Sequence, residues 1–314
     1  MKVLISDESF GKANSNAIKM LQDAGLQPVN YPQGKTFSEN DYISELSDDV
    51  IGIIAGVNEP FTKKVMEEAK SLKVISRFGT GIDNIDIEAA KEHGIVVCRT
   101  ADAPTQAVAE LTLALMLNLS RKINETDKKV RSGKWTPEIS YLIYGKTIGI
   151  VGLGRIGKVV VKLLEPFNVK ILVYEPYPDD KFILQYKIKL VPLNNLIAES
   201  DIISLHTPLT KETKGMIGKD ELRKMKNHAL LINTARGGLI DENALAKALE
   251  NHEIGGAALD VFEKEPYDGK LTEFDNVILT PHIGTFTIET RKKMEIQTVE
   301  NLIKALEEMK IIKN

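Results

Sequence analysis

The sequence predicts an α/β protein with two doubly wound, Rossmann-like domains, the second inserted into the first. Short runs of β-branched and other apolar residues alternate with amphipathic segments along nearly the whole chain. These runs show little polar alternation, which is typical of parallel strands covered by helices on both faces. The connections between them are long enough for right-handed helical crossovers. Repeated β/α units of this kind build doubly wound sheets.

The length and composition of the chain fit two folded domains of ordinary size. Its 314 residues are 43% hydrophobic and 27% charged, which is enough apolar content for substantial cores and unlike a disordered chain. The 41 Lys and Arg nearly balance the 44 Asp and Glu, so the formal net charge of -3 argues against a nucleic-acid partner. Any anion-binding site must therefore be local.

The single cysteine, Cys98, excludes an intramolecular disulfide and a cysteine metal cluster. We therefore expect no metal site and a reducing, cytoplasmic location. The N-terminal apolar run is too short for the core of a signal peptide. The most apolar long stretch, 107–120, contains Glu110 and is shorter than the roughly 20 residues that span a bilayer. This stretch predicts a buried helix, and we expect no membrane partner.

The first series of β/α units occupies the first hundred residues. Strands are expected at 2–6, 50–56, 74–79 and 95–100, with helices that end near Gly25 and begin near Asp86. The second series supplies strands at 146–152, 170–175, 202–206, 229–236, 256–261 and 277–282. The helix after Pro104 should link the two series, and the helical segment 286–310 should pack back on the first. These assignments predict one domain from 1–100 with 283–314 and another from 101–282.

A glycine-rich turn follows the first strand of the second series. The sequence GLGRIG places Gly152, Gly154 and Gly157 between a strand and a helix, with Arg155 and Ile156 among them. In a dinucleotide site the first glycine permits the tight turn, the second lets the backbone approach the pyrophosphate, and the third lets helix and strand pack closely. The helix N-terminus then faces the anion. A tight turn without a ligand is the alternative interpretation.

The next strand ends in Glu175, 18 residues after Gly157. An acidic residue at about this spacing hydrogen-bonds the ribose hydroxyls of NAD. A carboxylate there repels a 2′-phosphate, so the pair of motifs favours NAD over NADP. An exposed glutamate at a strand end, with no ligand, is the alternative.

Three more strand ends carry ionisable side chains: Arg236, Glu265 and His282. Ligands of doubly wound sheets bind outside the carboxyl ends of the strands, so these side chains can converge on one crevice. Arginine offers a fork for a carboxylate, and a histidine beside a carboxylate can deliver a proton near neutral pH. Taken singly, each has a structural alternative: a salt-bridged surface arginine, a solvated turn glutamate and a hydrogen-bonded core histidine.

Five motifs occur in an order that resembles the D-isomer-specific 2-hydroxyacid dehydrogenases. They are GLGRIG, SLHTPLT at 204–210, NTARGGLIDE at 233–242, ALDVFEKEP at 258–266 and LTPHIG at 279–284. The resemblance covers nearly the entire chain, and its wording is closest to D-3-phosphoglycerate dehydrogenases. It implies an NAD-dependent oxidoreductase in which Arg236 binds the substrate carboxylate, Glu265 supports His282, and His282 exchanges the proton.

The resemblance also implies contacts to the cofactor and to the substrate. Asp260 would bind the nicotinamide carboxamide, and further cofactor contacts would come from His206, Thr207, Pro208, Thr234 and Ala235. The segment 76–86 is similar to the family's substrate loop, in which the backbone of Gly79, Thr80 and Gly81 receives the carboxylate. Two glycines let a backbone approach a ligand closely, although a plain glycine turn explains them equally well. Asp83 is expected to cap the helix that follows.

The substrate is less defined than the reaction. Arg77 is a candidate for binding a distal anionic group such as a phosphate. Segments 53–60 and 98–104 depart from the wording of phosphoglycerate dehydrogenases, so glyoxylate, hydroxypyruvate or another anionic 2-oxo acid stay open. The chain length also leads us to expect no C-terminal regulatory domain and no serine feedback through one.

Two other functional classes stay open, together with the oligomeric state. An NAD-responsive corepressor could use the same fold, although the chain shows no basic patch or long disordered tail. A methyltransferase that uses S-adenosylmethionine would have no need for Arg236, Glu265 and His282 together. The resemblance further implies a homodimer, formed through the helix at 107–122 and the following arm to Tyr144, which includes Trp135 and Tyr141.

Overall fold

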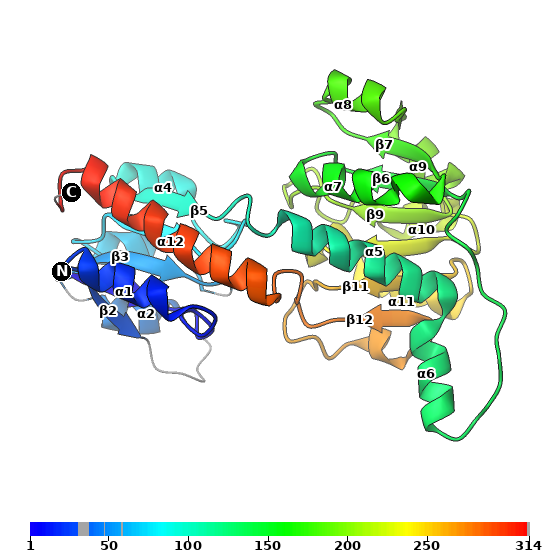
Figure 1. Ribbon diagram of the computed structural model, residues 1–314, viewed down its shortest axis with the longest axis horizontal. Helices are drawn as coiled ribbons and strands as arrows, with labels where there is room; N and C mark the ends of the chain where they lie inside the picture. The colour runs from blue at the N-terminus through cyan, green and yellow to red at the C-terminus, as the bar shows by residue number, and fades with distance from the viewer. Residues whose placement is uncertain (31–37, 47, 58, 313–314) are drawn as a thin grey trace. The chain divides into compact units, whose positions relative to one another are not determined.

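The computed structural model describes residues 1–30, 38–46, 48–57 and 59–312, which fold into two compact units (Figure 1). The first unit comprises Met1–Pro104 and Phe286–Asn314, and the second comprises Thr105–Thr285. The chain thus leaves the first unit once and returns to it once, so the second unit is an insertion. The predicted pair of doubly wound sheets is confirmed.

The first unit contains a sheet of five parallel strands in the order β2-β1-β3-β4-β5. Its strands are β1 (Lys2–Ile5), β2 (Gln27–Asn30), β3 (Val50–Ala55), β4 (Val74–Arg77) and β5 (Val96–Arg99). All six residues of β3 are buried, because helices cover both faces of this central strand. The strand order is that of flavodoxin-like folds.

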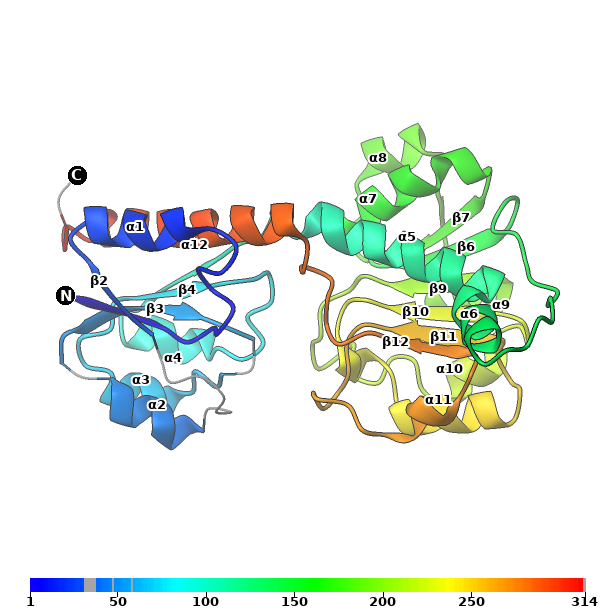
Figure 2. The same ribbon diagram turned by 60° about the horizontal axis from the view of Figure 1, so that its bottom comes forward.

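The helices of the first unit lie in two layers, as Figure 2 shows. One layer holds α1 (Ser15–Asp23) and α12 (Ile288–Glu308), and the other holds α2 (Glu39–Glu45), α3 (Lys63–Glu68) and α4 (Ile87–Glu92). The α4 helix begins where expected, but its cap differs from the prediction. Asp86, not Asp83, is the N-cap and accepts a hydrogen bond from the Ala89 amide at 2.9 Å.

The second unit contains seven parallel strands in the order β12-β11-β10-β9-β6-β7-β8. They are β6 (Thr147–Val151), β7 (Lys170–Tyr174), β8 (Lys189–Leu190), β9 (Ile202–Leu205), β10 (Leu230–Asn233), β11 (Gly256–Leu259) and β12 (Val277–Leu279). The strand order reverses between β6 and β9. In doubly wound sheets this reversal opens the crevice in which ligands bind.

Helices cover both faces of this second sheet. One face carries α5 (Thr105–Arg121), α7 (Arg155–Leu164) and α8 (Asp180–Gln185), and the other carries α9 (Leu193–Glu199), α10 (Lys219–Lys224) and α11 (Glu242–Glu250). The remaining helical segments are α6 (Ile123–Arg131) and the 3-10 turns η1 (Glu165–Phe167), η2 (Gly237–Leu239) and η3 (Lys270–Glu273). Within the described ranges, no helix is long and apolar enough to cross a membrane.

Candidate active site

The glycine turn after β6 shows a separate reason for each glycine. Gly152 has φ +96°, and a Cβ there would lie 2.7 Å from the carbonyl oxygen of His206. A Cβ on Gly157 would lie 2.3 Å from the carbonyl oxygen of Gly152, so this glycine permits close packing of helix and strand. A Cβ on Gly154 would meet no protein atom within 4 Å. Packing within the protein therefore does not require glycine at 154. The close approach of a ligand to the backbone at this position would require it.

Glu175 lies just beyond β7 and faces the same turn. Its Oε2 accepts a hydrogen bond from the Leu153 amide at 2.7 Å, and its Oε1 accepts one from the Tyr177 amide at 2.9 Å. The half-buried carboxylate is thus fixed beside the glycine turn. Arg155 begins α7 on the exposed side, while Ile156 packs against the apolar cluster under α5 and α7. This arrangement fits the adenosine side of a dinucleotide site.

The residues after β9 form a neighbouring part of the crevice. The Nε2 atom of His206 lies 2.9 Å from the Ser204 hydroxyl oxygen. Burial lowers the pKa of His206 to about 4, so its ring is neutral at physiological pH. Thr207 is half-buried and Pro208 is exposed. These side chains can therefore line a ligand site without placing a charge in it.

Asp260 shapes the loop that carries His282. Its Oδ1 accepts hydrogen bonds from the Thr280 hydroxyl at 2.6 Å and the Ile283 amide at 2.8 Å, and its Oδ2 accepts one from the Gly284 amide at 2.9 Å. Burial raises the pKa of Asp260, although these hydrogen bonds oppose the rise. His282 takes a positive φ of +54° in this loop. The carboxylate therefore holds the loop in a conformation that few non-glycine residues adopt.

His282 and Glu265 form a direct pair. The Nδ1 atom of His282 lies 2.9 Å from Oε2 of Glu265, whose Oε1 accepts a hydrogen bond from the Phe262 amide at 3.1 Å. Burial alone would raise the pKa of Glu265, but the hydrogen bond and charge of His282 outweigh it and hold this pKa below its ordinary value. An ionised Glu265 places the proton on Nδ1 and leaves Nε2 as the ring atom that can face a ligand.

Arg236 follows β10, the strand between β9 and β11. Its half-buried guanidinium donates from Nη1 to the Ala235 carbonyl at 2.6 Å. The positive charge of Arg236 is close enough to contribute to the low pKa of Glu265. The structure thus brings Arg236, Glu265 and His282 to one edge of the second sheet. The sequence motifs predicted each of them at the end of a strand.

Thr234 in the same turn is tied to α5 by a residue that sequence reasoning missed. The Thr112 hydroxyl donates to the Val108 carbonyl at 2.8 Å, so at its 2.9 Å contact with Thr234 it must accept the hydrogen bond. Both threonines are buried. The sequence signal was a lone threonine inside an apolar helix. Such a threonine often hydrogen-bonds a carbonyl of its own helix, so the sequence does not identify a partner outside it.

Besides Arg236, the predicted substrate-binding residues lie in the first unit, at the end of β4 and in the loop that follows it. Gly79 has φ +152°, and its carbonyl accepts a hydrogen bond from the Thr100 amide at 3.0 Å. Thr80 and Gly81 are half-buried. Arg77 is only 3% exposed, and its Nη1 donates to the Ala55 carbonyl at 3.4 Å and to the Phe78 carbonyl. The structure therefore places the Arg77 guanidinium inside the unit, where it supports the loop backbone.

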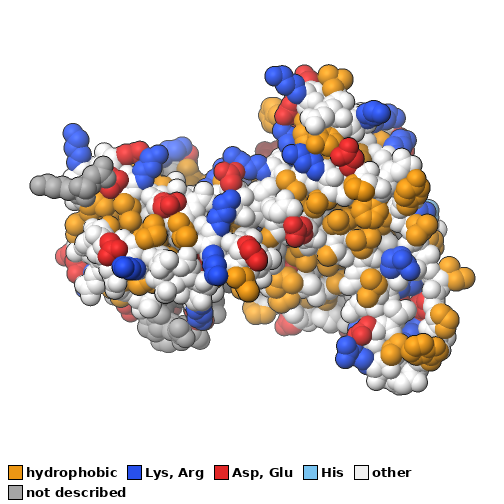
Figure 3. All heavy atoms as spheres, in the orientation of Figure 1, with side chains coloured by type: hydrophobic (Ala, Val, Ile, Leu, Met, Phe, Trp, Pro, Cys, Tyr) orange, Lys and Arg blue, Asp and Glu red, His pale blue; other side chains and the backbone are white. Residues whose placement is uncertain are grey.

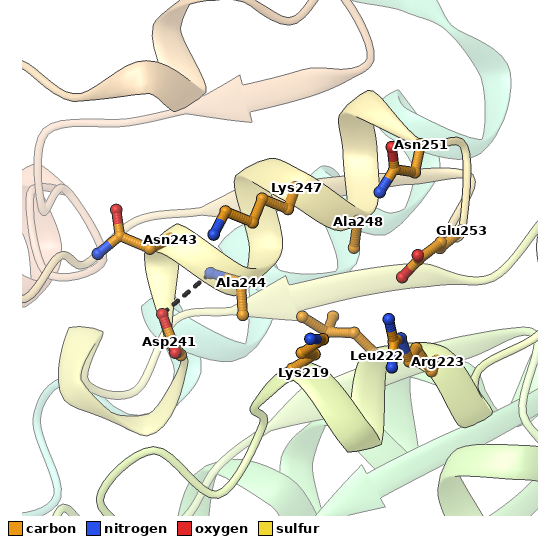
Figure 4. A pocket seen from close by; sticks show the side chains of 10 residues that line it. All are labelled: Lys219, Leu222, Arg223, Asp241, Asn243, Ala244, Lys247, Ala248, Asn251 and Glu253. Carbon is orange, nitrogen blue, oxygen red and sulfur yellow. Dashed lines mark hydrogen bonds between the residues drawn. The ribbon is translucent and has the colours of Figure 1, made fainter.

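Two other kinds of site could lie in the described residues: a metal centre and a cavity away from these strand ends. No group of three or more His, Cys, Asp or Glu in the described residues could hold a metal ion. A cavity of about 280 Å³ lies between α10 and α11 (Figure 4). Its lining mixes cations such as Lys219, Arg223 and Lys247 with Asp241 and Glu253, and it contains none of the residues described above. Of the departing segment 53–60, Asn58 lies outside the described residues.

Comparison with known proteins identifies a family and several relatives. Residues 113–284 match the family model described as "D-isomer specific 2-hydroxyacid dehydrogenase, NAD binding domain". A D-3-phosphoglycerate dehydrogenase from Methanocaldococcus jannaschii is 41% identical over 311 residues, covering 98% of this chain but 57% of the relative. The chain therefore spans little more than half the length of that relative. A glyoxylate reductase from Thermofilum pendens is 46% identical over 268 residues, covering 82% of this chain and 79% of the relative.

Solved structures agree with this match along nearly the whole chain. The TT0316 protein from Thermus thermophilus superposes with a TM-score of 0.89 at 36% identity, covering 98% of this chain and 97% of the other. A glyoxylate reductase from Paecilomyes thermophila gives a TM-score of 0.86 at 33% identity, with coverages of 98% and 95%.

Proposed function

Because the chain belongs to the D-isomer specific 2-hydroxyacid dehydrogenase family, we propose that it transfers a hydride between NAD and C2 of a D-2-hydroxy acid or the corresponding 2-oxo acid. The observation that carries the proposal is the His282–Glu265 pair, at 2.9 Å, on the sheet edge that also bears Arg236. The open face above Gly154 and the carboxylate of Glu175 fit the dinucleotide. When bound, NAD supplies or accepts the hydride.

The three ionisable residues then have distinct tasks. Nε2 of His282 gives a proton to the C2 oxygen during reduction and takes it back during oxidation. Glu265, ionised and hydrogen-bonded to Nδ1, orients the ring and fixes the proton of Nδ1. Arg236 binds the substrate carboxylate and stabilises the negative charge that develops on the C2 oxygen. Asp260 holds the loop that carries His282 in shape through its hydrogen bonds to the Ile283 and Gly284 amides. It is also proposed to bind the nicotinamide carboxamide.

The second unit, which contains the NAD-binding match, is proposed to hold the cofactor through the residues around Gly152–Gly157, Glu175 and His206–Pro208. The first unit is proposed to bind the substrate carboxylate through the backbone of Gly79–Gly81. The half-buried Thr80 and Gly81 support this role, because a ligand can reach this part of the loop, whereas the Gly79 amide already donates to the Arg77 carbonyl at 2.9 Å. A reducing compartment such as the cytoplasm suits the free thiol of Cys98.

An exposed arginine other than Arg77 lies beside the loop that is proposed to bind the substrate. Arg77 is buried against the loop, and Arg291 is only 9% exposed, lies over the Phe78 ring and pairs with Asp7 at 3.6 Å. Arg99 is exposed, and its Nη1 lies 3.5 Å from the Thr80 carbonyl oxygen. Arg99 is therefore the arginine best placed to meet a second anionic group, as in 3-phosphohydroxypyruvate. Glyoxylate and hydroxypyruvate are the alternative substrates.

A screen of NADH oxidation with 2-oxo acids that carry or lack a distal phosphate tests the reaction and the substrate together. We expect turnover, and we expect Arg99→Gln to lower kcat/KM for the phosphorylated acid about tenfold relative to that for glyoxylate, because a guanidinium–anion contact is lost. Lys91→Gln, which removes an exposed cation from α4 of the same unit, is the control and should leave the ratio unchanged. NADH binding without turnover of any acid would instead support a corepressor.

A homodimer is proposed through α5, α6 and the arm 133–144. Figure 3 shows hydrophobic side chains over this part of the second unit. Trp135 is 88% exposed and Ile139 is 94% exposed, although the Tyr141 amide anchors the arm to the Ser120 carbonyl at 2.9 Å. Large exposed apolar side chains on an anchored arm are typical of an interface.

Light scattering after gel filtration should give about twice the chain mass of 34.8 kDa. Ile139→Asp should shift the protein to the monomer, since the buried face of a dimer would have to accommodate a charge. The exposed Leu184→Asp on α8 is the matched control and should stay dimeric. A wild-type protein of monomer mass would refute the dimer.

A further inference from the structure

The turn that carries Arg236 is held by a side chain to which no role has been given. Asn233 is the last residue of β10 and the first residue of the NTARGG motif, and it is 0% exposed. Its Oδ1 accepts a hydrogen bond from the Ala235 amide at 3.0 Å, and its Nδ2 donates to the Arg236 carbonyl at 2.9 Å. One planar amide thus binds both ends of the short turn between the strand and Arg236.

We propose that Asn233 is a positioning residue for Arg236, through which the chain sets the direction of the guanidinium that binds the substrate. This inference rests on the proposed function of Arg236. The guanidinium itself donates to the Ala235 carbonyl, within the same turn, so a shift of the turn moves the guanidinium with it. A misplacement of about 1 Å at a reacting centre can cost about a hundredfold in rate.

Asparagine suits this position because its amide offers a donor and an acceptor in one plane. Aspartate keeps the acceptor for Ala235 but, when ionised, presents an oxygen to the Arg236 carbonyl and repels it. Protonation of that aspartate restores a donor. Asn233 also links the turn to the rest of the site, since its own carbonyl accepts a hydrogen bond from the Asp260 amide at 2.9 Å.

The decisive test is the pH dependence of Asn233→Asp. We expect Asn233→Ala to lower kcat/KM for the 2-oxo acid about 10- to 100-fold at every pH, with the Kd for NADH changed less than about threefold. Asn233→Asp should be similarly impaired at about pH 8 and should recover as the pH falls toward about 5, because the buried carboxyl becomes protonated and donates to the Arg236 carbonyl. Relief of a buried charge would also restore the fold, so thermal stability and the Kd for NADH are measured at both pH values; recovery of kcat/KM while these two stay constant points to the contact with the Arg236 carbonyl.

Each variant is compared with the wild type at the same pH. The titratable and charged groups around Asn233 are Arg236 in the turn, His206 after β9, and Asp260, Glu265 and His282 at the neighbouring sheet edge. The wild type carries all of them, so the ratio of variant to wild type removes their own titration. Turnover by the wild type tests the proposed function. The ratio of kcat/KM between variant and wild type at each pH tests whether Asn233 positions Arg236.

Asn276 provides a matched control at the opposite end of the same sheet. Its Nδ2 donates to the Gly255 carbonyl at 3.1 Å, so Asn276→Asp changes the same kind of contact away from the site. It should alter thermal stability without changing kcat/KM. If Asn233→Asp folds poorly, Asn233→Ser, which is too short to reach the Arg236 carbonyl, still tests the proposal: it should lower kcat/KM about 10- to 100-fold at every pH while the Kd for NADH changes less than about threefold. A pH-independent ratio for Asn233→Asp, or full activity of Asn233→Ala, would overturn the proposal.

Discussion

Replacing His282 with glutamine should lower kcat for reduction of the 2-oxo acid by about 10²- to 10⁴-fold, the range expected for loss of a general acid. Glutamine approximates the length of the imidazole and can still hydrogen-bond Glu265, so the loop held by Asp260 should keep its shape. It cannot give a proton to the C2 oxygen. The Kd for NADH should therefore change less than about twofold, and the loss should appear in single-turnover kinetics as a slower chemical step.

His228 supplies the matched control for this experiment. It pairs with Asp201 at 3.1 Å in the same unit, so it reproduces a histidine–carboxylate contact outside the site. Burial alone would raise the pKa of Asp201, but its hydrogen bonds from Lys226, the Thr147 amide and His228 outweigh burial and bring it to about 2. His228→Gln should keep wild-type kcat even if it costs some stability. A His282→Gln enzyme with wild-type kcat would remove the proton-transfer role altogether.

The sequence predicted strands best where both faces of a strand are buried. The β3 strand is a continuous apolar run, β10 is apolar up to its last residue, Asn233, and both strands lie inside their sheets. The edge strands β2 (Gln27–Asn30) and β8 (Lys189–Leu190) were missed, because half-exposed and exposed positions carry polar residues and a proline that give no apolar run. The edge strands β5 and β12 keep apolar residues and were predicted at 95–100 and 277–282, so strands were missed where the local apolar run is lost.

The same limit applies to the site. A glycine turn and ionisable side chains at strand ends are local signals, and doubly wound topology says that strand ends meet. That rule places His282 and Glu265 at one edge of the sheet, and the structure adds the 2.9 Å contact between them. The burial of Arg77 and the bonds of Asn233 do not follow from it, because they depend on side-chain direction within turns. Sequence spacing fixes which residues share an edge but not which atoms they bind.

Replacing Arg236 with alanine should lower kcat/KM for 2-oxo acids by about 10²- to 10³-fold, comparable to the loss of a donor that stabilises an oxyanion. Both substrate affinity and the chemical step should suffer, because one guanidinium is proposed to bind the carboxylate and to stabilise the C2 oxygen. Stability should change little. The half-buried side chain donates to the Ala235 carbonyl but leaves the Asn233 bonds of the turn in place.

Arg236→Lys separates charge from geometry. Lysine keeps the positive charge but presents no planar fork, so it should recover only part of the loss if a bidentate carboxylate contact is what matters. Nearly full activity of Arg236→Lys would show that charge alone suffices, and full activity of Arg236→Ala would refute the assignment. Arg223→Ala, an exposed arginine of α10 beside the remote cavity, should leave kcat/KM unchanged. Since Asn233 is proposed to act only through this guanidinium, Asn233→Ala should cost little further activity once Arg236 is alanine.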